Sequence, residues 1–481
     1  MNKPLLFITI FHLIVSAKEN MTVVVSMIDP HLEYFSKSVI RPFEKEHRVD
    51  ISIVNSNEID AIDDIVSGID DVGLFMVPFG TAWRMVDKKK ILPLQRILTN
   101  QEYRVFNEEY ILTWLGRKNN NQYFMPCKYE TRIMVYRKSK ADEAVSLWNG
   151  TGDKKTTLQD TIVSHLRSVN GIGLPRGYRL EADPEQWDYF DIFVIGSIWT
   201  SMPESKGQGK IGHRGKEYSG TALRIIDRVY QCGGDSLTML AMDGDPVIDA
   251  FTWEATYAAF DIYNRNMIKD GWSGMDLWKK FATETIYLSF LTQVDCFTVH
   301  GTKNNTLPGK LNNPDDLGFA TMPAGCSITL NADSTIKRSG SKAVTNGGWW
   351  WAIPHDAQNA LRSYKLFRHI TSREIQMKEC TTFGMIPVRN DVLKCNHILA
   401  RNDWIADIFL VSYNQVKINN NIVVPAHHSF TDLSDLYLDA WSYLIGSRKW
   451  ARKNASTPDI KVITEVLEKK YTGRAYRILN R

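Results

Sequence analysis

Near its start the chain reads Thr22-Val-Val-Val-Ser-Met27, an apolar run with the length of a β-strand. Two similar runs follow, at Val49-Asp-Ile-Ser-Ile-Val54 and at Val72-Gly-Leu-Phe-Met-Val77. Helix-like stretches separate the three runs, one beginning at Asp29-Pro30 and the other covering residues 60–68. This order of strand, helix, strand, helix and strand predicts an α/β fold built on a parallel sheet.

Ligands of such sheets collect beyond the carboxyl ends of the strands. Three residues that follow the predicted strands are therefore candidate ligand contacts: Asp29, Phe79 and Trp83. Asp29 either contacts a ligand or caps the helix beside it, because an Asp side chain accepts hydrogen bonds from the first N–H groups of a helix. Trp83 either offers a flat ring for stacking or belongs to the core.

The composition is that of a folded protein without a strong charge of either sign. Hydrophobic residues make up 43% and charged residues 23% of the 481 positions, close to the averages of globular domains. The formal net charge of +4 is too small over this length to attract nucleic acid, and it favours a neutral, hydroxyl-rich ligand. The 14 Trp residues are the unusual feature, since Trp serves either a core or a binding surface.

Residues 1–17 are predicted to be a secretory signal peptide. Lys3 supplies a positive start, and Leu5 to Val15 form an apolar stretch shorter than the about 20 residues of a membrane-spanning helix. The alternative is a first strand or buried helix of the mature fold. No cysteine follows this stretch closely, so we expect a soluble periplasmic protein without a lipid anchor.

Motifs for catalysis and for metal binding are missing from the sequence. It has no P-loop, no zinc-protease helix and no nucleophile elbow, and its six cysteines lack the spacing of metal ligands. Disulfide pairing among the cysteines stays open. Asp183, Glu185 and Asp188 either supply a glycosidase pair or cap a helix beginning near Pro184, and capping is favoured. We therefore expect no enzyme activity, no cofactor and no metal.

Several stretches of the chain, taken in order, resemble one protein family. The sequence is similar to the extracellular solute-binding proteins of ABC importers, in their maltose-binding-like, sugar-associated branch. The stretches that carry the resemblance are Val23–Pro30, Val72–Pro78, Tyr123–Tyr136, Gly233–Asp235, Lys269–Gly271, Leu317–Gly325, Gly347–Pro354 and Phe383–Arg389.

The resemblance implies a two-lobed fold in which each lobe is a mainly parallel sheet flanked by helices. The chain would cross the hinge between the lobes more than once and end in a helical extension. Lobe one is predicted at residues 20–131 plus 345–390, and lobe two at 132–344 plus 391–481. Residues 178–220 depart from the family pattern, and the glycine- and charge-rich part from 204 to 220 is predicted to be an exposed loop.

A sugar presents an apolar face and a rim of hydroxyl groups, so its site needs aromatic rings together with charged or amide groups. The run from Gly348 through Trp349 and Trp350 is the strongest candidate. Alternate residues of a strand face opposite sides, so at least one of these rings is expected in the cleft. Trp349, next to the glycine, is favoured, and the alternative is that the rings belong to the core.

The predicted crossing between the lobes carries Tyr129, Glu130 and Arg132. These side chains either contact the ligand or stabilise the hinge through an ion pair or hydrogen bonds. Trp199 is a candidate contact from lobe two. His300 ends a predicted strand, Val294 to Val299, at a place where the family pattern often has an aromatic residue.

The function implied by the resemblance is that of a periplasmic solute-binding component of an ABC transporter. It would capture a small solute, a sugar or oligosaccharide, and present it to the permease subunits at the membrane. The alternative from another class is a secreted carbohydrate-active hydrolase that uses the same cleft. A sensor protein could also read the closed state in place of a permease. A monomer is expected, without nucleic acid as a partner.

Overall fold

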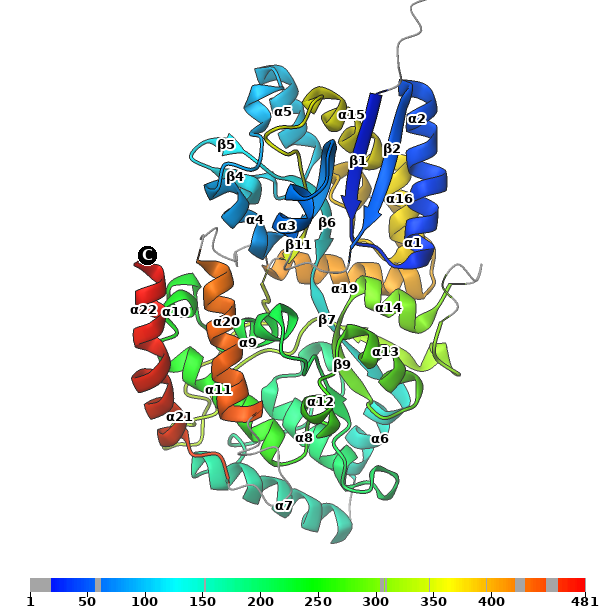
Figure 1. Ribbon diagram of the computed structural model, residues 1–481. Coiled ribbons are helices and arrows are strands. Elements are labelled where there is room, and N and C mark those ends of the chain that lie inside the picture. Colours follow the sequence, from blue (N-terminus) through cyan, green and yellow to red (C-terminus); the bar gives the residue numbers. More distant parts are fainter. Residues whose placement is uncertain are drawn as a thin grey trace, which may run out of the picture.

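The computed structural model describes residues 19–56, 62–150, 153–302, 307, 309–345, 347–394, 396–419, 429–446 and 457–480. The predicted signal peptide, residues 1–17, lies outside this part of the chain. The main strands form two sheets, each with helices packed around it, one above the other in Figure 1. We call the sheet that contains the first strand, with its helices, lobe one, and the other sheet with its helices lobe two.

The sheet of lobe one has the strand order β2-β1-β3-β11-β6. Its strands are β1 Glu19–Val25, β2 Val49–Asn55, β3 Val72–Pro78, β6 Met125–Glu130 and β11 Gly347–Ala352. The parallel arrangement predicted for the first three strands is confirmed, because β1 pairs in parallel with both β2 and β3. β11 then joins antiparallel to β3 on one side and to β6 on the other.

The sheet of lobe two has the order β10-β7-β9-β8, and its bounds are β7 Arg132–Arg137, β8 Ile211–Gly212, β9 Leu288–Thr292 and β10 Leu317–Ala320. The predicted mainly parallel sheet is wrong for this lobe, since only β8 and β9 pair in parallel. β7 pairs antiparallel with both β9 and β10. A short hairpin of β4 Arg117–Lys118 and β5 Asn121–Gln122 forms a third, two-stranded sheet.

The antiparallel pairings follow from the way the chain crosses the hinge. Only Thr131 separates β6 from β7, so one extended segment leaves the first sheet and enters the second. The chain returns along the same path in the opposite direction, because β10 pairs antiparallel with β7 and β11 pairs antiparallel with β6. The hinge is therefore crossed more than once, while the exact residue limits predicted for the lobes stay a prediction.

Helices surround both sheets and form the C-terminal extension (Figure 1). Those nearest the first sheet are α1 Asp29–Tyr34, α2 Arg41–His47, α3 Ile62–Ser67, α4 Phe79–Asp87, α5 Asn100–Glu109, α15 Ala360–Ile370, α16 Arg373–Phe383 and α17 Asn390–Leu393. The remaining α-helices are α6 Lys138–Asn149, α7 Asp153–Asn170, α8 Tyr189–Ser201, α9 Ser219–Gln231, α10 Ser236–Ala241, α11 Asp245–Ala259, α12 Asn266–Lys269, α13 Gly274–Ala282, α14 Gln293–His300, α18 Asn396–Leu399, α19 Trp404–Asn419, α20 Phe430–Trp441, α21 Ile460–Val466 and α22 Gly473–Leu479.

The C-terminal helices belong to the side of lobe two. α19 packs against β7 and β10, and α20 packs against α9. α20 also contacts α4, which follows β3 of the first sheet. Phe409 and Val416 of α19 also belong to the core of lobe one. The predicted helical extension is thus present, and it contacts both lobes.

Two local predictions are wrong, each for its own reason. The predicted strand Val294–Val299 is helix α14. Thr292 and Asp295 start this helix with reciprocal hydrogen bonds, the Asp295 carboxylate accepting from Thr292 N at 3.1 Å and Thr292 Oγ accepting from Asp295 N at 3.3 Å. Residues 209–215 of the predicted exposed loop 204–220 are buried except for the half-buried Arg214, because β8 adds to the sheet there.

Two of the three acids near Pro184, Asp183 and Asp188, are helix caps as predicted, whereas the Glu185 carboxylate accepts hydrogen bonds from Thr321 N and Oγ. Asp183 Oδ1 accepts a hydrogen bond from Glu185 N at 2.9 Å, and Asp188 Oδ1 accepts from the first N–H groups of α8. Asp191 completes a reciprocal pair of hydrogen bonds, since its Oδ2 accepts from Asp188 N at 3.0 Å. These bonds occupy the carboxylates and order the start of a helix that is buried for most of its length.

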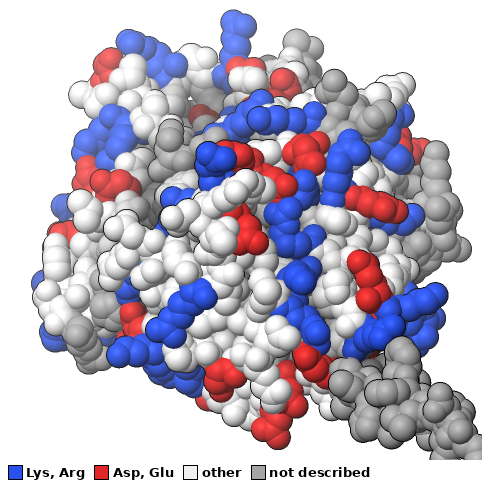
Figure 2. Space-filling view, turned by 90° about the horizontal axis from the view of Figure 1, so that it is seen from above, with Lys and Arg blue, Asp and Glu red and all other residues white. Residues whose placement is uncertain are grey.

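The surface carries both signs of charge. Figure 2 shows Lys and Arg side chains interspersed with Asp and Glu over the face seen from the end of lobe one. A mixed surface of this kind agrees with the small formal net charge of +4 and does not steer ligands of one sign over long distances.

Asp191 makes the stability of the protein depend on pH. Burial, with the nearby Asp188, raises the pKa of Asp191 to about 7. The folded state therefore holds a proton that the unfolded state releases, so the stabilisation is complete at low pH and is lost as the pH rises through about 7. Between pH 6 and pH 8 we expect Asp191 to cost about 1.4 kcal/mol of unfolding free energy.

Urea unfolding of the wild type and of Asp191→Asn at several pH values measures how much Asp191 contributes to the pH dependence of the unfolding free energy. The variant lacks the titrating group, so its unfolding free energy should fall less over the same interval. Parallel pH profiles of the two proteins would contradict the assignment.

Candidate functional site

The strand that crosses the hinge carries a row of charged side chains. Lys128, Glu130 and Arg132 alternate along β6 and β7 with Tyr129 and Thr131, both of which are buried. Lys128 Nζ lies 3.0 Å from Glu130 Oε1. Burial opposes the charge of Glu130, but Lys128, with Arg214 and Arg132 farther down, outweighs it and holds the pKa of this carboxyl below its usual value.

Trp349 and Gly348 cover the first part of this row. The Lys128 ammonium lies 5.6 Å from the centre of the Trp349 ring, a cation–π distance. Gly348 has φ of +149° and lies opposite Tyr129 in the sheet, where a Cβ would come within 2.6 Å of Lys128 O. Only glycine therefore allows β11 to lie this close to the crossing strand.

Arg132 joins the crossing strand to α9 of lobe two through hydrogen bonds and an ion pair. Its Nε and Nη2 each donate to Asp227 of α9 at 2.7 Å, and Nη2 also donates to Thr345 Oγ at 2.5 Å. Asp227 accepts two further bonds, from Thr345 N at 2.8 Å and from Thr345 Oγ at 2.7 Å. All three residues are buried, so the ion pair is shielded from water.

Lobe two presents a second ion pair toward this row. Arg214 Nη2 lies 3.9 Å from Asp295 Oδ2, and Trp278 Nε1 donates to Asp295 Oδ1 at 3.0 Å. The two pairs influence each other across the hinge: Arg214 helps to lower the pKa of Glu130, and Asp295 helps to raise that of Lys128. Charges of both signs from both lobes therefore meet at one place, beside the ring of Trp349.

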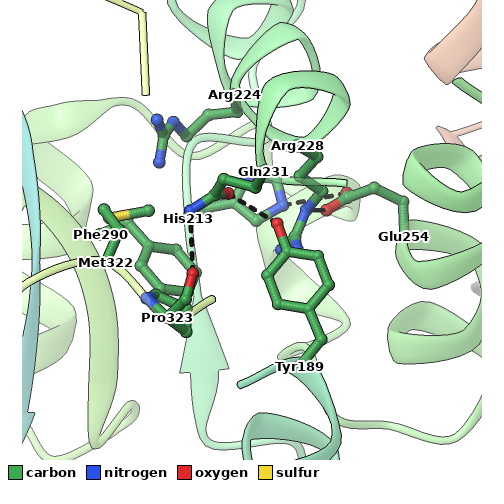
Figure 3. Close-up of a pocket in the computed structure, with 9 residues that line it drawn as sticks. All are labelled: Tyr189, His213, Arg224, Arg228, Gln231, Glu254, Phe290, Met322 and Pro323. Atoms are coloured by element: carbon green, nitrogen blue, oxygen red, sulfur yellow. Dashed lines mark hydrogen bonds and ion pairs between the residues drawn. The ribbon is translucent and has the colours of Figure 1, made fainter. Parts of the chain in front are cut away.

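A small pocket lies in lobe two below the hinge (Figure 3). Its lining consists of Tyr189, His213, Arg224, Arg228, Gln231, Glu254, Phe290, Met322 and Pro323. Glu254 and Arg228 form a buried ion pair on one side of it. Gln231 joins the Tyr189 hydroxyl, at 2.6 Å, to the Pro323 carbonyl, at 3.1 Å. The space is about 10 Å³, the room of roughly one water molecule.

The structure brings together five of the predicted site residues. Tyr129, Glu130, Arg132, Gly348 and Trp349 lie on the adjoining strands β6, β7 and β11. Arg132 follows the hinge-stabilising alternative that the sequence left open, through its bonds to Asp227.

The residues after the first strands lie differently. Asp29 is exposed, and its role as helix cap is wrong: Ile28 occupies the cap position of α1, and no side chain caps that end. Asp29 has instead entered the first turn, where Pro30 follows it. Trp83 is 1% exposed and packs edge-on against Phe124 at 5.1 Å.

The side chain of Phe79, the first residue of α4, lies outside the described part of the chain. Trp350 is buried on the opposite side of β11 from Trp349, as the alternation of a strand predicts.

Two candidates of lobe two lie apart from the crossing strand. Trp199 is fully buried, and its Nε1 donates to Lys140 O at 2.8 Å, so the ring belongs to the core in this structure. His300 ends α14 and stacks on Trp404 with ring centres 3.8 Å apart. That pair lines a separate hollow of about 340 Å³ with Tyr136 and Phe319.

Sequence reasoning missed Lys128, Arg214, Arg224, Asp227 and Asp295. Lys128 could have been found, because it alternates with Glu130 in the same strand. Arg214 was hidden in the stretch assigned to an exposed loop. Arg224 and Asp227 lie in a helix and meet the hinge only through the fold, Asp227 being 95 residues from Arg132.

The sequence profile of the family described as bacterial extracellular solute-binding protein matches residues 38–407. No curated protein matches the sequence. Within the described residues, no helix is long and apolar enough to cross a membrane. The same residues contain no group of three or more His, Cys, Asp or Glu side chains arranged to hold a metal ion.

Solved structures similar to this chain have the two-lobed fold. Maltose-bound MalE3 of T. maritima has 14% identity and a TM-score of 0.65, with 94% of this chain and 99% of that chain covered. The GacH receptor of Streptomyces glaucescens, solved without ligand and with acarbose, has 14% identity, a TM-score of 0.65 and coverages of 96% and 99%.

A third similar structure is an ABC transporter solute-binding protein of Thermotoga lettingae bound with alpha-D-tagatose. It has 16% identity and a TM-score of 0.65, and 96% of this chain and 100% of that chain are covered. Near-complete coverage in all three comparisons means that the similarity extends over both lobes.

Replacing Arg132 tests the lock between the crossing strand and α9. Arg132→Gln leaves Asp227 buried without its main counter-ion, and we expect the unfolding free energy to fall by about 3–5 kcal/mol. Arg179→Gln, at an exposed position of lobe two, should change it by less than about 0.5 kcal/mol. Urea unfolding followed by circular dichroism measures the unfolding free energy of both variants. Equally small decreases for the two would show that the Arg132–Asp227 ion pair does not stabilise the hinge.

Proposed function

The chain belongs to the bacterial extracellular solute-binding protein family, and we propose that it captures a saccharide between its two lobes for an ABC importer. The observation that supports this most directly is the cluster at the hinge, where a Trp ring and charged groups from both lobes meet. Trp349 and Lys128 come from lobe one, and Arg214 and Asp295 come from lobe two. The similar structures with maltose, acarbose and tagatose support a saccharide as the solute.

The chemistry of the cluster suits a sugar. An aromatic ring packs against the apolar face of a pyranose, while carboxylates and guanidinium groups hydrogen-bond with its hydroxyls. Trp349 supplies the ring at the lobe-one side, with Glu130 nearby on the adjoining strand. Tyr218 adds a second ring at the lobe-two side, about a cation–π distance from Arg214 at 6.0 Å.

Closing of the lobes would follow from this arrangement. The crossing from β6 to β7 is short, with a single residue between the two strands, so rotation of one lobe against the other is concentrated there. A solute that touches both lobes binds the closed state more tightly and so shifts the population toward it. The permease would recognise the closed state, after export of the chain to the periplasm by residues 1–17.

We infer that the cluster binds its solute without hydrolysing it. A glycosidase needs a carboxylic acid with a raised pKa to protonate the leaving group. Glu130 departs in the opposite direction, because Lys128 and the arginines keep it ionised. This observation disfavours the alternative of a carbohydrate-active hydrolase.

Binding is tested with a panel of mono- and oligosaccharides in a thermal-shift assay, followed by calorimetry. A saccharide at 100 times its dissociation constant should stabilise the folded protein by about 2.7 kcal/mol. If no saccharide raises the melting temperature, the proposed function is wrong; release of sugar from a glycoside would instead favour the hydrolase.

Trp349→Ala tests the position of the site. Loss of one stacked ring should weaken saccharide binding by about tenfold. Trp114→Ala is the matched control, because Trp114 is an exposed ring of lobe one outside the hinge strands. Calorimetry of both variants with the saccharide identified in the panel measures the effect, and equal affinities would move the site away from Trp349.

A further inference from the structure

Two guanidinium groups share one carboxylate beneath the hinge. Asp227 accepts two hydrogen bonds from Arg132, at 2.7 Å each, and also pairs with Arg224 one turn back along α9. Thr345 occupies further acceptor positions of the same carboxylate through its N and Oγ. The group of Arg132, Arg224 and Asp227 therefore carries one positive charge more than it can neutralise.

The nearby Glu254 is already committed to other partners. It forms an ion pair with Arg228, and it accepts from Tyr263 Oη at 2.7 Å and from Trp441 Nε1 at 3.2 Å. Arg228 and His213 outweigh the effect of burial and keep the pKa of Glu254 well below its usual value. Arg228 and Glu254 thus neutralise each other, so Glu254 does not balance the charge of Arg224.

Arg224 is buried although it shares its counter-ion, Asp227, with Arg132. It is 5% exposed, and its Nε has no hydrogen-bond partner among the residues that the structure describes. Burial, followed by the proximity of Arg132, Arg214 and Arg228, lowers the pKa of Arg224 well below its usual value. An arginine nevertheless keeps its proton in a protein, so the charge stays, and a buried charge that is only partly compensated is costly.

Arg224 lines the small pocket below the hinge. Figure 3 shows its guanidinium on the side away from Glu254, above Phe290 and Met322. The space of about 10 Å³ admits roughly one oxygen atom. A ligand would therefore reach Arg224 with one oxygen. Arg224 pairs with Asp227, which also binds Arg132 of the crossing strand, so this oxygen would lie beside the hinge.

We propose that the captured saccharide bears an acidic group, a carboxylate or a sulfate ester, and that Arg224 is its counter-ion. An oxyanion placed there neutralises the surplus charge and satisfies the free Nε donor, which a hydroxyl group does only in part. A neutral sugar leaves the surplus positive charge of the Arg132, Arg224 and Asp227 group uncompensated, so the pocket selects for the acid. This inference rests on the proposed function and replaces the neutral ligand that the small net charge favoured.

The test compares acidic saccharides with neutral counterparts of the same size. Oligogalacturonates of one to four units, their carboxyl-reduced forms and a sulfated disaccharide are titrated by calorimetry against the wild type, Arg224→Gln and Arg179→Gln. Arg179 is an exposed arginine of lobe two and serves as the charge-matched control. The uronates and the sulfated sugar distinguish the two sources of the anionic group.

The expected result is binding of an acidic saccharide at least about tenfold tighter than its neutral form, with Arg224→Gln removing that preference. Arg179→Gln should keep it. Equal binding of neutral and acidic forms, or a preference that survives Arg224→Gln, overturns the inference and leaves the proposed function standing. If no saccharide of either kind binds, the proposed function fails and the inference fails with it.

The unliganded protein gives a second, independent readout. Because its charge is not neutralised, removing Arg224 should leave the unfolding temperature of the free protein unchanged or higher, in contrast to Arg132→Gln. A fall as large as that of Arg132→Gln would mean that Arg224 is part of the structural ion pair, and would overturn the inference.

Discussion

The buried ion pair between Arg132 and Asp227 is the interaction on which the site depends. Arg132 begins the strand that enters lobe two, and Thr345 precedes the strand that returns to lobe one. Both bind the same carboxylate of α9. One side chain thus holds the outgoing and the returning crossing at a single point, so the geometry of the hinge is set by a few short hydrogen bonds between buried groups.

The charged row above this lock follows from it. With Arg132 fixed, the strand alternation places Glu130 and Lys128 on the same side, next to Trp349. Arg214 and Asp295 meet them from lobe two. Because Arg132 and Arg224 share Asp227, their charges are not fully balanced. The structural role of Arg132 is therefore the reason for the binding role proposed for Arg224.

Parts of this arrangement could be predicted from the chain, and others could not. The parallel start of the first sheet depends on neighbouring stretches with a clear period, and the prediction was correct. The strand assigned to Val294–Val299 was wrong, since a capping pair at Thr292 and Asp295 outweighs β-branched residues. Glycine and charge around Arg214 predict an exposed loop, because both are typical of surface turns. Tertiary contacts instead bury the neighbouring Lys210, Ile211 and His213.

The sequence indicated the two-lobed class and the crossing at Tyr129 to Arg132 through its resemblance to the solute-binding family, which is carried by short stretches in order along the chain. The Trp run could be found because its residues are adjacent in the chain. Only the tertiary structure decided which charges face one another. Asp227 lies 95 residues from Arg132, and Thr345 lies 213 residues from it, so no local pattern relates them. Electrostatic balance is a property of distances in space, and the surplus charge at Arg224 becomes visible only when those distances are known.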